Sequence, residues 1–206
     1  MAFGAKLGAI QLMGGVVSQV QSQAVVPFLI NGHQRSLWLN VTAVIGGSLL
    51  LALLAQVSFI LPFTPVPITG QTFGVAVLAL CWGRKRALAS FALYLSEGAM
   101  GLPFFALGKS GLLLGPTFGY LIGMLLASGV VGHLADKGYA RTIKSAFACC
   151  LVGSFIIFSC GLLGLSFFVP AKALLVTGFL PFIPGDLIKS FAAASLASTV
   201  SKKFKL

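Results

Sequence analysis

The feature that most constrains this chain is a series of long apolar stretches, separated by short segments rich in Pro, Gly, Lys or Arg. A helix that crosses a bilayer needs about 20 predominantly apolar residues, and it satisfies its backbone polar groups internally because lipid offers them no partners. Of the 206 residues, 58% are hydrophobic and only 8% are charged, whereas about 25% are charged in soluble domains. The sequence therefore predicts an all-α, polytopic membrane protein.

Six membrane-spanning helices are predicted from the apolar runs and the residues that break them. They cover residues 41–61, 71–83, 87–102, 115–132, 145–168 and 184–201. The first two are separated by a segment with Pro62, Pro65 and Pro67, which remove backbone donors and bias the residues before them away from helix. The apolar segment 170–183 is interrupted by prolines and a glycine, and we expect a helical excursion into the membrane there.

The N-terminal part differs from the rest of the chain. Residues 1–37 are interpreted as an N-terminal extension, and residues 38–206 as the six-helix membrane domain. The stretch 7–20 is only mildly apolar and contains several Gly and Gln, so we expect it to be flexible or to lie at the membrane interface. Lys6 before this run leaves a signal peptide open, although no clear cleavage site follows.

The basic residues are distributed unequally between the two sides of the predicted spans. Eleven of the 14 Lys and Arg lie on the side that holds both termini, whereas the other side has only Lys109 and Lys172. Because cytoplasmic loops carry an excess of Lys and Arg, we predict an N-in, C-in protein of the cytoplasmic (inner) membrane. A net charge of +11 is also typical of nucleic-acid binding, but no RNA-reading motif accompanies it, and no nucleic-acid partner is expected.

Two of the three acidic residues, Glu97 and Asp186, fall in or near predicted spans. Ionisable groups at membrane depth are costly unless they are paired or face a polar cavity, which makes them functional candidates. Asp186 and Lys189 are three residues apart at the start of the last helix and share one face. They form either an ion pair between helices or an acceptor and a donor for one ligand. Pro184-Gly185 favours the second hypothesis, because it lets a ligand approach the helix N-terminus closely.

The fourth predicted span contains glycines every four residues. Gly115, Gly119 and Gly123 form a smooth strip that is typical of close helix packing. Tyr120 lies beside this strip, and it is either an interfacial anchor or a stacking wall of a binding site.

Catalytic, metal and ATP sites are not predicted. The four Cys lie in apolar segments without metal-ligand spacing, and the two His have few candidate partners for nucleophile–base pairing. Gly108-Lys109-Ser110 lacks the upstream glycine of a phosphate-binding loop and lies on the predicted outer side. We therefore do not interpret the chain as an ATPase or another enzyme.

Three stretches carry a family resemblance through their order and spacing. They are Thr64–Gly74, then Gly101–Phe105 leading into Leu114–Gly123, and finally Leu180–Lys189. Together they resemble the BioY family, the biotin-specific S components (substrate-binding subunits) of energy-coupling factor (ECF) vitamin transporters. The resemblance covers about residues 40–200 and leaves the N-terminal extension unexplained.

The resemblance implies a six-helix membrane protein that captures biotin near its outer face and delivers it inward. Its partners would be an ECF transmembrane T subunit, cytosolic ABC-type ATPases and membrane lipid. Biotin would be the transported ligand, and no cofactor would be needed. The substrate-binding residues implied by the matching motifs are Asp186, Lys189, Gly115, Pro116, Thr117, Gly119, Tyr120, Phe104 and Gln71. The segment 64–71 would act as a lid.

S components commonly dock the T subunit through an Ala-x-x-x-Ala patch on the first helix. The nearest equivalents here are Ala43-x-x-x-Gly47 and Ser48-x-x-x-Ala52, and either pair fits. Other functions also stay open. They are a solitary carrier for biotin or another vitamin that works without an ATPase module, a membrane enzyme that acts on lipids, and a structural or channel subunit.

Overall fold

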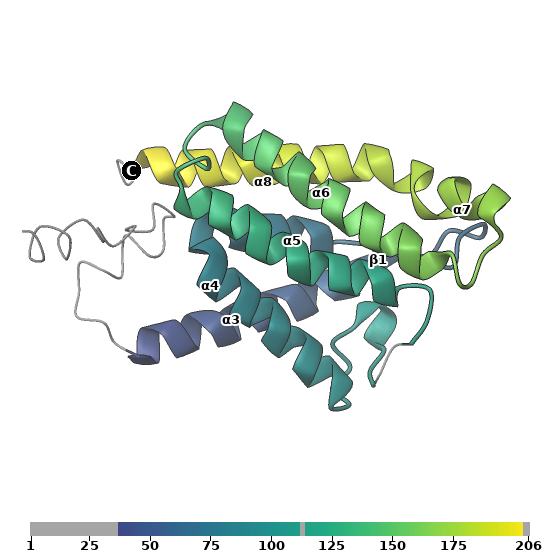
Figure 1. Ribbon diagram of the computed structural model, residues 1–206. Coiled ribbons are helices and arrows are strands. Elements are labelled where there is room, and N and C mark those ends of the chain that lie inside the picture. The colour runs from purple at the N-terminus through teal and green to yellow at the C-terminus, as the bar shows by residue number, and fades with distance from the viewer. Residues whose placement is uncertain (1–36, 112–113, 204–206) are drawn as a thin grey trace, which may run out of the picture.

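The computed structural model describes residues 37–111 and 114–203, and most of these residues are helical. The predicted N-terminal extension lies outside the described residues, apart from Leu37. The helices pack into an elongated bundle (Figure 1). They are α3 (Leu37–Gln56), α4 (Gln71–Ala99), α5 (Phe118–Asp136), α6 (Ile143–Leu165), α7 (Ala171–Gly178) and α8 (Ile183–Lys203), with the 3-10 turns η1 (Ala106–Gly108) and η2 (Leu180–Phe182) and the strands β1 (Ser58–Phe59) and β2 (Ile68–Thr69).

The outer surface of the bundle is apolar over long distances. Among the described residues, four helical stretches are long and apolar enough to cross a membrane. They are 37–56, 118–136, 143–165 and 171–203, and the last of these counts α7, η2 and α8 as one stretch. Large side chains such as Trp38, Phe155 and Ile188 are more than 70% exposed on these helices. Because exposed apolar area on this scale is stable only against lipid or another protein, the fold is that of a multi-pass membrane protein.

Helix α4 contains a sharp break at Gly83. This residue has φ 74° and ψ −179°, a backbone conformation that essentially only glycine adopts. The Asp136 carboxylate accepts a 3.0 Å hydrogen bond from the Arg84 backbone N–H and so caps the second half of α4. The first and second halves then lie side by side, since Gln71 Nε2 donates to Tyr94 Oη at 2.7 Å. The predicted helices 71–83 and 87–102 are therefore two helical segments joined directly at Gly83.

Some predicted boundaries were wrong. The first helix ends at Gln56 and not at residue 61, because the chain enters a short antiparallel hairpin that pairs Ser58 with Thr69. Helix α5 begins at Phe118 and not at residue 115, since Pro116 disfavours helix in the residue before it. The segment predicted as a helical excursion is indeed helical and forms α7 and η2.

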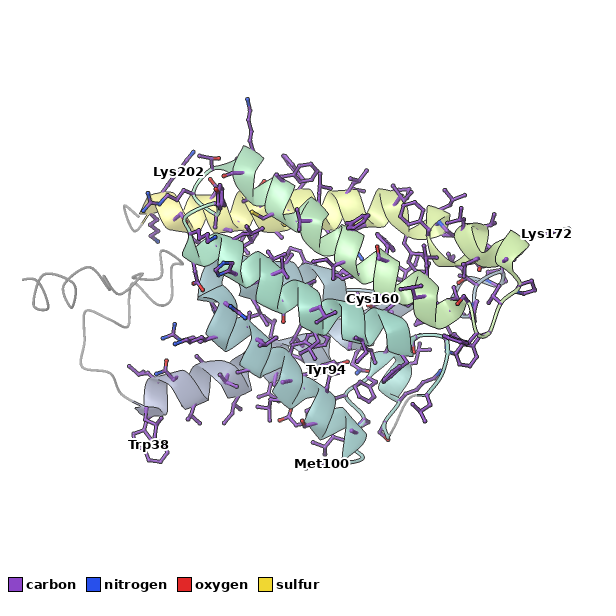
Figure 2. All side chains as sticks on the ribbon, viewed as in Figure 1. Trp38, Tyr94, Met100, Cys160, Lys172 and Lys202 are labelled. Atoms are coloured by element: carbon purple, nitrogen blue, oxygen red, sulfur yellow. The ribbon has the colours of Figure 1, made fainter. Side chains whose placement is uncertain are left out.

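Most of the basic residues that the structure describes gather at one end of the bundle, whereas Lys109, Lys172 and Lys189 lie toward the other end. Arg86 donates to Asn40 Oδ1 at 2.7 Å, and Ser198 Oγ donates to the Arg141 carbonyl at 3.1 Å. Together with the hydrogen bond from the Arg84 N–H to Asp136, these contacts bring the start of α3, the break in α4, the α5–α6 connection and the end of α8 together. Figure 2 shows Trp38 and Lys202 at this end, and Met100 and Lys172 at the opposite end. The segregation of charge agrees with the predicted loop pattern, whereas the N-in orientation stays a prediction.

The small residues of α3 pack inside the protein. Ser48 and Ala52 are buried, and the Ser48 hydroxyl donates to the Glu97 carboxylate of α4. A Cβ on Gly47 would lie 2.8 Å from the Ser90 Cβ, so α3 and α4 are in close contact there. Ser48 and Ala52 are thus not an exposed docking surface in this structure, and Gly47 of the other candidate pair also lies against α4.

Candidate ligand-binding site

A cavity lies at the end of the bundle opposite the basic residues. It is enclosed by the β2 segment, the loop around η1, and the ends of α4, α5, α6 and α8 that face away from the basic end. Its lining residues are Val66, Pro67, Thr69, Gln71, Thr72, Phe105, Ala106, Lys109, Thr117, Tyr120, Leu121, Met124, Ile157, Phe158, Phe182, Asp186 and Lys189. Mostly apolar walls with a few convergent polar groups are typical of small-molecule sites.

Asp186 and Lys189 both line this cavity. Asp186 is only 7% exposed, and its carboxylate has the Ser154 hydroxyl as a side-chain hydrogen-bond partner. The Lys189 ammonium donates a 3.0 Å hydrogen bond to the Thr69 carbonyl. Neither side chain points to lipid, and each has a neutral partner from another element. The two charges therefore occupy the wall of the cavity, as the ligand hypothesis requires.

Gln71 connects the hairpin to helix α4. Its side chain is buried, and its Oε1 accepts a 3.1 Å hydrogen bond from the Thr69 hydroxyl. The 2.7 Å hydrogen bond from its amide nitrogen to Tyr94 Oη uses the donor side of the same group. A buried amide that is satisfied at both ends is held in one orientation, so Gln71 gives the cavity a fixed polar edge.

Tyr120 forms an aromatic wall of the cavity and is not an interfacial anchor. It is 6% exposed, and its hydroxyl donates to the Gly178 carbonyl at 2.6 Å. Its ring centroid lies 6.3 Å from that of Phe182, which in turn lies 6.4 Å from Phe158. Gly161 has no side chain where a Cβ would overlap the Tyr120 ring. The absence of a side chain at Gly161 thus makes room for this wall.

The structure does not bring all the predicted site residues together. Gly119 faces α6, where a Cβ would lie 3.0 Å from the Gly164 Cα, and Gly123 likewise packs against Ile157. Gly115 and Gly119 line a separate apolar groove, while Pro116 is in neither lining set. Since consecutive positions of a helix point in different directions, Tyr120 can face the cavity only if Gly119 faces elsewhere. Gly119 and Gly123 thus agree with the packing interpretation of the strip, whereas Gly115 does not, because a Cβ there would meet nothing within 4 Å.

Phe105 lines the cavity in place of Phe104, which was predicted to do so. Phe105 is 4% exposed and lines the cavity, whereas Phe104 packs beside it on the core. The neighbouring loop is held by Gln56, whose amide nitrogen donates to the Phe105 carbonyl at 3.2 Å. Gln56 also accepts from the Gly108 N–H at 3.1 Å. The loop therefore has a defined shape and places Lys109 in the cavity lining.

Several lining residues were missed in the sequence. Lys109 carries a signal that was not used, because it is one of only two cations on the predicted outer side. Thr72 follows directly after the predicted contact Gln71, and it too lines the cavity. Ile157 and Phe158 lie in a uniformly apolar span, where no local pattern separates a cavity-facing side chain from a lipid-facing one.

The segment before α4 closes over the cavity. The Thr64 hydroxyl donates to the Thr177 carbonyl of α7 at 2.6 Å, and the Gly70 N–H donates to the Val57 carbonyl at 2.9 Å. Val66 is 5% exposed and lies against the lining. The hairpin is therefore fastened both to α7 and to its own base. Within the described ranges, no group of three or more His, Cys, Asp or Glu could hold a metal ion.

The fold and the cavity together define a helical membrane protein that has a partly polar cavity near one end. The fold matches a crystal structure described as the S-component for biotin from an ECF-type ABC transporter, with a TM-score of 0.76 and 24% sequence identity. The match covers 82% of this chain and 94% of that chain.

The chain belongs to the BioY family, whose family model matches residues 31–206. It is 40% identical over 147 residues to "Biotin transporter BioY" of Thermotoga maritima, which covers 69% of this chain and 85% of that protein. A protein of the same name from Rhodobacter capsulatus is 32% identical, with 79% and 93% coverage. The family assignment from sequence is thereby confirmed, and these relatives are transporters rather than enzymes.

Proposed function

We propose that this protein is the substrate-binding subunit of a biotin uptake system, which captures biotin from the outer side of the cytoplasmic membrane. The observation that carries the proposal is the cavity in which Asp186, Lys189 and Lys109 converge between aromatic side chains. The family membership supports biotin as the ligand.

The chemistry of biotin suits this lining. The ureido ring has two N–H donors and one carbonyl acceptor, so it can donate to the Asp186 carboxylate and accept from the Lys189 ammonium. The thioether ring and the valeryl chain are apolar and suit the walls of Tyr120 and Phe182. A buried acceptor also gives selectivity, because an analogue without the matching donor leaves that acceptor unpaired.

The charge of the cavity is also complementary to biotin. The charged residue types in its lining are Lys109, Lys189 and Asp186, and their formal charges sum to one net positive charge. Biotin has one carboxylate and is a monoanion at neutral pH. Lys109 belongs to the loop around η1, away from the buried Asp186, and we assign it to the carboxylate of the bound vitamin.

We assign the lid function to the segment 64–71. It contributes Val66, Pro67 and Thr69 to the lining, and its hydrogen bonds to Lys189 and Thr177 are the contacts that must break for the cavity to open. Release of these contacts would admit biotin from outside, and their recovery would exclude water from the bound ligand.

The wider transport cycle follows from the family context. In this proposal, residues 38–206 form one biotin-binding membrane domain with six crossing segments, N-in and C-in, because α4 reverses at Gly83. An ECF T subunit and cytosolic ATPases supply the energy for inward delivery. The solved match described as part of an ECF-type ABC transporter supports this arrangement.

The direct test is calorimetric titration of the purified protein with biotin, with biotin methyl ester as the comparison ligand. We expect saturable binding of biotin and weaker binding of the ester, which lacks the charge that Lys109 recognises. A folded protein that does not bind biotin contradicts the proposed function. Uptake of labelled biotin by vesicles containing this chain alone would contradict the ATPase-dependent mechanism and would indicate a solitary carrier.

A further inference from the structure

A second, smaller chamber lies directly beneath the candidate site. The four residues that line both spaces are Thr72, Ile157, Asp186 and Lys189. The chamber continues toward the basic end of the bundle, because its remaining walls come from the next turns of the same helices, including Val75, Ala127, Ser154 and Ser190. We call it the inner chamber.

The inner chamber has the size of one water molecule. Its volume is about 20 Å³, and a buried water needs roughly 10–15 Å³ on the same measure together with two to four polar partners. Polar side chains line it from three helices, namely Thr72 of α4, Ser154 of α6, and Asp186, Lys189 and Ser190 of α8. A chamber lined only by hydrocarbon would stay dry, but this lining is rich in hydrogen-bonding groups.

One of these groups lacks a partner. The Thr72 hydroxyl oxygen is buried, and among the residues that the structure describes nothing hydrogen-bonds to it. Buried hydroxyls in native proteins are almost always satisfied by protein or by ordered water, because an unsatisfied one costs free energy. Thr72 also lines the inner chamber, so a water molecule bound in the chamber is the partner that would satisfy this hydroxyl.

We propose that the inner chamber binds one structural water molecule, which hydrogen-bonds to the Thr72 hydroxyl and to the polar groups around Asp186. This water is present before the ligand arrives. It provides a polar floor beneath Asp186 and Lys189 and keeps both side chains hydrogen-bonded inside an apolar bundle. Because this water belongs to the ligand-free protein, its presence does not depend on which vitamin is bound.

The test is thermal unfolding of the ligand-free protein with Thr72→Val, Val131→Ile and the double variant. Val131 lines the inner chamber, and the added methylene would expel the water. We expect each single variant to lower Tm by about 2–4 °C, the shift typical of losing one buried hydrogen bond in a domain of this size. The double variant should lower Tm by clearly less than the sum of the two single decreases, since both changes remove the same water. The control is Val130→Ile, because Val130 is 41% exposed outside the chamber.

If the inner chamber is empty, Thr72→Val should leave Tm unchanged or raise it. Filling a dry cavity and replacing an unsatisfied hydroxyl by a methyl group both stabilise a protein, so an unchanged or raised Tm for Thr72→Val overturns the proposal. Fully additive losses would indicate steric strain at Val131 and also overturn it. A high-resolution crystal structure of the ligand-free protein should show solvent density within hydrogen-bonding distance of Thr72 Oγ1, and a clearly empty chamber would contradict the inference.

Discussion

The ammonium of Lys189 donates a 3.0 Å hydrogen bond to the backbone carbonyl of Thr69, which lies 120 positions earlier in the chain. This contact joins the last helix to the hairpin that covers the cavity. Lys189 thus lines the cavity and also holds the hairpin, which we propose to act as the lid. A ligand that competes for this ammonium would also change how firmly the lid is held, which connects binding to closure.

Asp186→Asn should weaken biotin binding by about 1–3 kcal/mol, because the amide replaces a buried charged acceptor and presents a donor toward the ureido N–H groups. Isothermal titration calorimetry of the folded variant measures this change. The matched control is Asp136→Asn, since Asp136 caps the second half of α4 at the opposite end of the bundle. Equal affinities for the Asp186 variant and the unmodified protein would exclude Asp186 as a direct contact.

Lys109 and Lys172, which both lie toward the cavity end of the bundle, should respond differently to substitution. Lys109 lines the cavity, whereas Lys172 is in α7 outside the lining. Because Lys109 is exposed and its charge is screened, Lys109→Met should weaken biotin binding by only about 2- to 5-fold, and less at high salt. Lys172→Met should leave the dissociation constant unchanged. The assignment of Lys109 to the carboxylate is wrong if both variants lose affinity equally.

The fastening of the lid to α7 can be tested with a pair of threonines. Thr64→Val removes the hydroxyl that donates to the Thr177 carbonyl and accepts from the Val66 N–H. The lid should therefore open more often, and bound biotin should dissociate faster by at least the roughly 2- to 12-fold factor that corresponds to one hydrogen bond. The Thr177→Val variant keeps the accepting carbonyl, so biotin should dissociate from it at the original rate. A chase of labelled biotin with excess unlabelled biotin gives both rates, and identical rates would show that this bond does not limit opening.

Substitutions at Gly119 in α5 and at Gly115, which precedes this helix, distinguish a role in packing from a role in binding. Gly119→Ala places a methyl group against the α6 backbone, and overpacking of this kind typically costs about 1–3 kcal/mol. We therefore expect a lower Tm for this variant in detergent. Gly115→Ala meets nothing within 4 Å and should change neither Tm nor biotin affinity. A loss of affinity in a fully stable Gly115→Ala protein would restore Gly115 to the binding site.

The predicted orientation can be measured by labelling single cysteines in a variant without the native Cys81, Cys149, Cys150 and Cys160. Lys172→Cys should react with a membrane-impermeant maleimide in intact cells, because α7 lies at the cavity end of the bundle. Lys202→Cys lies at the basic end and should react only after permeabilisation. The reverse labelling pattern would indicate the opposite orientation, with the cavity on the cytoplasmic side.

The amino-acid sequence was sufficient for features that depend on neighbouring residues. The apolar runs predicted the main helices, and Gly83 ended the second of them in a backbone conformation that other residues avoid. Asp186 and Lys189 were recognised because charge is rare in apolar segments, and the i, i+3 spacing put both on one face. Their common place in the cavity lining agrees with this expectation.

Only the tertiary structure decided which residues line the cavity and how it is closed. In soluble proteins a polar face marks the outside of each helix, but in a bilayer the lipid-facing and interior faces are both apolar. The sequence therefore could not show that Tyr120 faces the cavity while Gly119 faces α6, or that Phe158 contributes to the wall. The contact of Lys189 with Thr69 and that of Thr64 with Thr177 each join segments more than 100 residues apart, and such pairings arise from how the helices pack together.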